Sequence, residues 1–177
     1  MKKVILLLLV AGISRAALAQ YKLVEAGSSA KFTIKNLGFG VDGAFSGFEG
    51  FVGFDPQNPA NSRFDVTIDA ASVNTGNNLR DEHLRGQSYF DVKNSPKIRL
   101  QSNKITAMGK NGIYLFSGLL SIKGKSKQIS FPFSATPQAD GFVFKGSFKM
   151  NRRDFDIGGT STVADELEVN INAIVGK

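Results

Sequence analysis

Apolar and polar residues alternate with a period of two along much of this 177-residue chain. The clearest stretches are residues 64–70, 128–133, 142–150 and 167–173. The alternation is less regular in residues 31–41, 44–55, 97–103 and 112–122. Because successive side chains of a β-strand point to opposite faces, the pattern predicts about eight strands, each with one apolar face.

Short turns and one helix separate the predicted strands. Turn-forming residues lie at 55–59, 109–112, 123–125 and 138–141. Connections of this length join antiparallel neighbours. Residues 77–86 open on asparagine and close on glycine, which predicts a short helix between the third and fourth strands. Pro132 has no N–H to donate and therefore marks a strand edge, a bulge or a strand end.

Strands of this number and spacing are typical of an up-and-down β-barrel or a sandwich. Hairpin-length connections, long continuous apolar faces and the absence of a long Greek-key return favour the barrel. We therefore predict an all-β fold, an eight-stranded antiparallel up-and-down barrel with one short helix.

The first 19 residues have the pattern of a secretory signal peptide. Lys2 and Lys3 precede the apolar run 4–13, and small residues at positions 17 and 19 predict cleavage after Ala19. The run is shorter than the roughly 20 residues that span a bilayer, which disfavours a membrane anchor. We expect a single domain over residues 20–177. An exported chain without cysteine fits the bacterial periplasm.

Composition excludes several classes of function. The chain has no cysteine and one histidine, which rules out a disulfide scaffold, a cysteine nucleophile and a cysteine-ligated or two-histidine metal site. Nucleotide-binding loops and the serine-hydrolase elbow are absent from the sequence. We expect a binding protein rather than an enzyme, without a cofactor. Loss of the leader removes three basic residues and lowers the formal charge from +7 to +4, a weak basis for nucleic-acid binding.

The interior of an eight-stranded barrel can be filled by side chains or can hold one small ligand. Gly50, Gly118 and Gly146 lie on apolar faces and would leave space there. One hypothesis is an elongated, dry cavity for a long apolar ligand; the alternative is that these glycines relieve strain in a packed barrel. The residues that we predict to line the cavity are Phe48, Val52, Phe54, Phe64, Val66, Ile68, Tyr114, Phe116, Gly118, Leu120, Phe131, Phe133, Phe142, Phe144, Gly146 and Phe148.

Two polar segments are candidates for the ligand's polar end. Arg80, His83 and Arg85 on the short helix could contact an anionic or carbonyl head group, or they could form a solvated helix face. Residues 151–154 could form a polar collar at a cavity mouth, or an ordinary loop with an Arg–Asp pair. The basic turn 123–127 is interpreted as solubilising, with transient contact to a membrane surface as the alternative.

Three segments together resemble the YceI-like family over essentially the whole chain after the leader. They are residues 80–92 (RDEHLRG followed by YFDV), 118–133 (GLLSIKGKSKQISFPF) and 148–158 (FKMNRRDFDIG). The resemblance implies a lipocalin-like barrel of secreted bacterial proteins that binds polyisoprenoid or similar amphiphilic lipids without known catalysis. It implies a ligand polar end near Arg80, Asp81, His83, Leu84, Arg85, Asn151, Arg152 and Asp154.

The sequence departs from the family pattern at Ser95, Lys125 and Asp156, which bears on head-group specificity rather than on the fold. We predict a periplasmic carrier of a long isoprenoid lipid, of quinone or polyprenyl phosphate type. The alternatives are a stress-related interaction barrel with a filled interior and no lipid, and an enzyme on lipids that would use His83 or a carboxylate pair as its base. The oligomeric state is left open, with a dimer among the alternatives.

Overall fold

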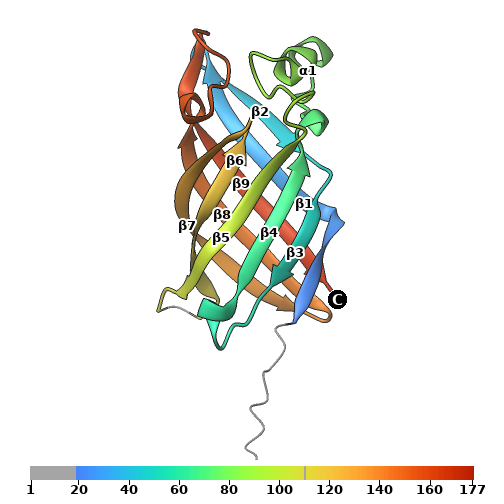
Figure 1. Ribbon diagram of the computed structural model, residues 1–177, viewed down its shortest axis with the longest axis vertical. Helices are drawn as coiled ribbons and strands as arrows, with labels where there is room; N and C mark the ends of the chain where they lie inside the picture. Colours follow the sequence, from blue (N-terminus) through green and yellow to red (C-terminus); the bar gives the residue numbers. More distant parts are fainter. Residues whose placement is uncertain (1–18, 110) are drawn as a thin grey trace, which may run out of the picture.

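A closed antiparallel sheet forms almost the whole molecule (Figure 1). The computed structural model describes residues 19–109 and 111–177; the predicted leader lies outside the described residues except for Ala19. The strands are β1 (Gln20–Asn36), β2 (Phe39–Phe45), β3 (Glu49–Gly53), β4 (Arg63–Asp69), β5 (Lys97–Ala107), β6 (Ile113–Ile122), β7 (Lys125–Gln138), β8 (Gly141–Asn151) and β9 (Val163–Gly176). β1 pairs with both β2 and β3, each strand from β3 to β8 pairs with the next one along the chain, and pairing of β1 with β9 closes the barrel.

β2 and β3 share one position in the barrel. Both pair with β1, β2 along residues 30–36 and β3 along residues 20–22. The barrel therefore has eight strand positions, which confirms the predicted eight-stranded antiparallel fold. β3 goes on to pair with β4, and β2 does not. Among the described residues, the far edge of β2 has one backbone bridge, between Ala44 and Asn74.

The connection from β4 to β5, residues 70–96, covers one end of the barrel and is called the cap. It contains the turn η2 (Ala70–Ser72) and the helix α1 (Asn78–Arg85). Asn77 caps α1 by accepting a hydrogen bond from the Arg80 backbone N–H, and Gly86 ends the helix. This confirms the predicted helix. The C-terminus lies at the opposite end of the barrel, called the terminal end (Figure 1). None of the helices in the described part of the chain is long and apolar enough to cross a membrane.

The predicted strand over residues 31–41 is wrong in its boundaries. A tight turn at Leu37 and Gly38 divides this stretch between β1 and β2, and both residues have left-handed φ angles of 51° and 85°. Such a two-residue turn suits the twist of a hairpin. The predicted strand 44–55 is also divided, because residues 46–48 separate β2 from β3.

β7 and β8 pair only over their terminal-end halves. The register runs from Gln138↔Gly141 to Phe133↔Gly146 and ends next to Pro132. Pro132 therefore lies where the pairing of β7 with β8 ends, at an edge of β7 that β8 does not cover. A strand edge was one of the three roles predicted for this proline. Beyond that point β7 continues on β6 and β8 continues on β9. We call this boundary, between residues 125–132 and 147–151, the seam.

Candidate functional site

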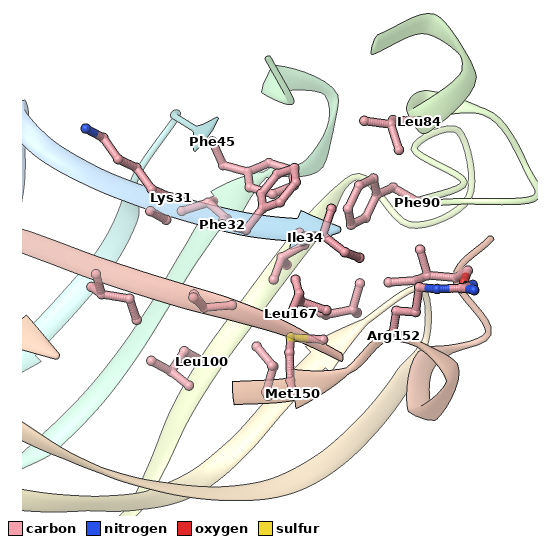
Figure 2. Close-up of a pocket in the computed structure, with 18 of the residues that line it drawn as sticks. Lys31, Phe32, Ile34, Phe45, Leu84, Phe90, Leu100, Met150, Arg152 and Leu167 are labelled. Atoms are coloured by element: carbon pink, nitrogen blue, oxygen red, sulfur yellow. The ribbon is translucent and has the colours of Figure 1, made fainter. Parts of the chain in front are cut away.

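A cavity of about 210 Å³ occupies the cap half of the barrel. Its lining is almost entirely hydrocarbon. Figure 2 shows Leu84 and Phe90 facing the cavity from the cap, opposite Met150 and Leu167 from the barrel wall. Strand β7 contributes no lining residue within the described chain; the other strand positions contribute Leu23, Ala30, Phe32, Ile34, Val41, Phe45, Phe48, Val66, Ile68, Ile98, Leu100, Leu120, Ile122, Phe148, Met150, Leu167, Val169, Ile171 and Ala173.

A packed aromatic cluster, called the plug, fills the terminal half and forms the cavity floor. Phe54 is 2% exposed and lies at its centre. Its ring centroid is 5.0 Å from that of Phe142, 5.1 Å from that of Tyr114 and 5.2 Å from that of Phe144, in edge-to-face geometry. Aromatic pairs favour this arrangement. The other members of the plug are Tyr21, Val52, Phe64, Ile105, Phe116, Phe131, Phe133, Ala135 and Val175.

The structure divides the predicted cavity residues between these two regions. Those that line the cavity are Phe48, Val66, Ile68, Leu120 and Phe148. Those that belong to the plug or pack against it are Val52, Phe54, Phe64, Tyr114, Phe116, Phe131, Phe133, Phe142 and Phe144. The predicted elongated cavity is therefore shorter than its predicted lining implies, because packed aromatic rings fill the terminal half.

Of the two roles considered for the glycines, the surroundings of Gly118 and Gly146 do not support space for a ligand. A Cβ added at Gly118 would lie 2.1 Å from the Gln101 carbonyl oxygen and 2.8 Å from the Phe116 ring. A Cβ at Gly146 would lie 3.0 Å from the Phe131 ring. Both glycines admit a neighbouring ring or backbone rather than opening space for a ligand. Gly50 has a φ of 113°, and its Cβ would clash with the Asp65 carbonyl oxygen at 2.2 Å.

Arg80 brings a positive charge to the cavity lining. Its Nε donates to the Thr75 hydroxyl at 2.7 Å and its Nη2 to the Thr75 carbonyl at 2.8 Å. Asp81 is 4% exposed and accepts hydrogen bonds from the backbone N–H and hydroxyl of Thr75. Asp81 therefore holds Thr75, and Thr75 orients Arg80. No carboxylate in the described chain lies within 4 Å of the Arg80 guanidinium.

Other predicted polar-end residues on α1 lie elsewhere. Arg85 donates to the backbone carbonyls of Ala71 and Val73, so it fixes the helix to the start of the cap. His83 is exposed and is not part of the cavity lining. Leu84, which the family resemblance singles out, does line the cavity (Figure 2).

Arg152 lines the cavity but acts chiefly on the backbone. It is 3% exposed, and its guanidinium donates to the carbonyls of Ile157 at 2.6 Å, Val163 and Ala164 at 3.0 Å and Gly159 at 3.2 Å. It also forms an ion pair with Asp165 at 2.9 Å. These bonds hold the β8–β9 connection in shape. The Asn151 side chain accepts from the Arg153 N–H and caps the turn η3 (Arg152–Phe155).

Side chains rather than a backbone ladder close the seam. The rings of Phe131 and Phe148 stack at 4.8 Å. Lys127 pairs with Asp154 at 3.7 Å, and Lys125 pairs with Asp156. The hydrogen bond from Lys125 is the main cause that lowers the pKa of the Asp156 carboxyl, and the charges of Lys123, Lys125 and Lys127 add to it. Two departures from the family pattern, Lys125 and Asp156, thus contact each other.

Sequence reasoning missed much of the cavity wall, including Phe32, Ile34, Met150, Leu167 and Val169. A usable signal was present. Along β4 the inward residues change from Phe64 to Ile68, and similar aromatic-to-aliphatic changes occur in β6 (residues 114–122) and β8 (residues 142–150). In an up-and-down barrel, every second strand runs in the same direction. The aromatic starts of β4, β6 and β8 therefore lie together in the terminal half, and their aliphatic later parts lie together in the cap half.

The described residues, 19–109 and 111–177, contain no group of three His, Cys, Asp or Glu side chains that could hold a metal ion. The site thus combines a hydrocarbon cavity, an aromatic floor, a helical cap and three basic lining residues, the exposed Lys31, the half-buried Arg80 and the buried Arg152. This arrangement defines a ligand-binding β-barrel, in which the closed sheet supplies the container and the cap lies over it.

Comparison with known proteins specifies the family. Residues 21–175 match the YceI-like domain family, and the chain belongs to this family. A UPF0312 protein of Yersinia pestis is 33% identical over 153 residues, which cover 80% of this chain and 78% of that protein. The crystal structure of Burkholderia cenocepacia BcnA has a TM-score of 0.81 and 29% identity, and covers 88% of this chain and 99% of that one.

A more distant structure shares the fold. It is a polyisoprenoid-binding domain from Saccharophagus degradans implicated in plant cell wall breakdown. It has a TM-score of 0.69 and 14% identity, and covers 88% of this chain and 97% of that one. These neighbours agree with the barrel described above.

Proposed function

We propose that this protein is a periplasmic carrier that holds the tail of an isoprenoid or similar amphiphilic lipid in the cavity, with the polar head near Arg80. The observation that carries the proposal is the hydrocarbon cavity with a single guanidinium in its lining that lacks a carboxylate partner among the described residues. The signal-peptide pattern supports export, and the polyisoprenoid-binding domain of the same fold supports the lipid class.

The cavity favours a branched or linear hydrocarbon. Burying apolar surface is worth about 25 cal/mol per Å², and a cavity whose surface is almost entirely apolar gives water few partners. Its size exceeds the roughly 150 Å³ of an apolar cavity that stays dry and binds benzene. At about 210 Å³ it accepts a segment of a long tail. The plug prevents deeper insertion, so the rest of a long lipid lies toward the cap.

The polar end favours an acceptor of hydrogen bonds with negative charge. Thr75 occupies Nε and Nη2 of Arg80, whereas Nη1 forms no hydrogen bond within the described chain. A half-buried cation gains most from a charged acceptor, because charge-assisted hydrogen bonds are about twice as strong as neutral ones. This supports a prenyl phosphate over an uncharged quinone or prenol.

The two alternatives find less support. A stress-related barrel with a filled interior accounts for the plug but not for the hollow cap half. An enzyme that uses His83 as its base requires that side chain at the ligand, whereas it is exposed on α1 and outside the cavity lining. We propose a binding protein without catalytic activity.

Native mass spectrometry tests the function. The mature protein is titrated with geranylgeranyl phosphate and with geranylgeraniol, which share a tail and differ in the head. We expect one-to-one complexes with both, and tighter binding of the phosphate. Arg80→Gln lowers affinity for the phosphate about tenfold, consistent with one lost charge-assisted hydrogen bond, and leaves the alcohol unchanged.

Arg63→Gln is the matched control, because Arg63 also donates to backbone carbonyls but is the first residue of β4, at the terminal end. It should leave both affinities unchanged. A bare polypeptide mass with both lipids would contradict the carrier function. Equal losses for phosphate and alcohol in Arg80→Gln would contradict the head-group site alone.

A further inference from the structure

The three most exposed large apolar side chains of the described residues all lie at the cap end. Phe39 is 78% exposed, Leu79 is 72% and Leu37 is 70%, whereas the remaining exposed ones range from 38% to 47%. Leu37 and Phe39 form the tip of the β1–β2 hairpin, and Leu79 lies on α1. Figure 1 shows α1 and this hairpin at the same end of the barrel. Protruding apolar residues are thus concentrated where the cavity lies.

The hairpin tip continues the cavity wall outward. In β2, Phe39, Val41 and Phe45 share one face, because residues two apart on a strand point to the same side. Val41 and Phe45 line the cavity. Phe39 lies on the same face and is exposed, so the apolar face of β2 extends from the cavity to the tip of the hairpin.

Charge at this tip suits a lipid surface. Residues 36–41 carry no charged side chain. Lys35 precedes them on β1 and is exposed, and Arg80 lies one residue from Leu79 on α1. Asp42 follows them on β2 and accepts a hydrogen bond from the Thr33 hydroxyl. Neither cation forms an ion pair with a carboxylate of the described chain. An uncharged apolar tip with the cations Lys35 and Arg80 behind it complements an acyl layer beneath anionic head groups.

We propose that the cap end docks on the surface of a lipid bilayer, with Leu37, Phe39 and Leu79 inserted among the acyl chains. The inference rests on the proposed function, since a carrier of bilayer lipids must meet the bilayer. Docking places the apolar face of β2 between the acyl layer and the cavity. The hydrocarbon tail of the lipid can then move along this face with little exposure to water. Separate protruding tips on two elements suit a fluid layer better than a flat protein partner.

An introduced tryptophan reports on docking, because the chain contains none. Phe39→Trp places the only indole at the tip. Met108→Trp places it on the β5–β6 connection, 47% exposed and at the opposite end. With vesicles of phosphatidylethanolamine containing a minority of phosphatidylglycerol, we expect a blue shift and quenching by brominated acyl chains for Phe39→Trp. Met108→Trp should show neither.

Charged substitutions then test which residues insert. Leu37→Asp introduces a residue type that tolerates the left-handed φ of this turn. Leu79→Asp introduces the same charge at an exposed position of α1. Added to the Phe39→Trp reporter, each should lower vesicle partitioning about tenfold. Met108→Asp in the same background should not.

Loading of geranylgeranyl phosphate from detergent solution separates the two proposals. Normal loading without a vesicle-dependent shift overturns membrane docking and leaves the carrier function standing. Loss of loading in the parent protein overturns the carrier function itself. A blue shift that occurs without vesicles, together with a dimeric mass in light scattering, overturns docking in favour of a second copy on the free edge of β2.

Discussion

The two halves of the barrel interior follow the same alternating pattern and reach different results. In the terminal half, edge-to-face and stacked rings fill the space around Phe54. In the cap half, aliphatic side chains such as Ile34, Leu167 and Val169 line a cavity. The wall is the same closed sheet in both halves. Side-chain volume at each level therefore decides where the barrel is solid and where it is hollow.

The halves also differ in how the wall is held. β7 and β8 share a backbone ladder next to the plug, whereas packed rings and ion pairs close the seam beside the cavity. A packed core with a complete ladder resists local opening, and a wall held by surface ion pairs resists it less. The terminal half thus acts as the rigid base, and the cap half contains the parts expected to move for a ligand.

Truncation of the plug should give the largest effect. Phe54→Ala removes a ring surrounded by aromatic neighbours, and such changes in a packed core cost about 3–5 kcal/mol. Leu167→Ala is the cavity-wall counterpart and should cost about 1 kcal/mol or less, because its side chain already borders empty space. Urea unfolding of the mature protein measures both. Equal losses would contradict the division into a solid and a hollow half.

Removal of Arg152 should have the next largest effect. Arg152→Met leaves the carbonyls of Ile157, Gly159, Val163 and Ala164 without their donor. We expect a loss of about 2–3 kcal/mol, since hydrogen bonds to charged groups are each worth about 1.5–3 kcal/mol and water replaces some of them. Hydrogen exchange should show the loosening in residues 156–163. The neighbouring Arg153→Met is the control, because Arg153 is exposed and should cost little.

A larger side chain should be tolerated in the cavity wall and not in the plug. Ala135→Phe overpacks the plug and should cost about 1–3 kcal/mol. Val169→Phe places the same ring in the cavity wall, where it should be tolerated and should reduce lipid loading by filling the site. Paired unfolding and native mass measurements test this. Full loading in Val169→Phe would show that the ligand lies outside the cavity.

Acidification should give the smallest and most local effect. Lys125 lowers the pKa of Asp156, so the pair remains intact above the ordinary carboxyl pKa and is lost as the pH falls through the lowered value. Protection factors of residues 125–132 and 147–151 should then fall, while those of 133–138 and 141–146 stay constant. Lys125→Gln at neutral pH should reproduce the change. Uniform loss of protection along β7 and β8 would contradict a specific role of the ion pair.

Local patterns in the sequence were enough for much of the fold and for part of the site. Alternation identified the strand faces, and the capping residues of α1 identified the helix. The turn at Leu37 and Gly38, which divides residues 31–41 into two strands, was not predicted, because leucine is not a residue type typical of a left-handed turn. The sequence left two roles open for Gly118 and Gly146, because the rings and backbone that cover them are placed only by packing.

What the sequence by itself determined is the set of half-buried antiparallel strands and the helix between them, because both depend on neighbours within a few residues. Only the tertiary structure decided which parts of the apolar faces meet. The register of the closed sheet brings aromatic ends to one level and aliphatic ends to another, and it places Lys125 beside Asp156 across the seam. The volume enclosed at each level is a sum over side chains from all around the barrel, so no single strand specifies it.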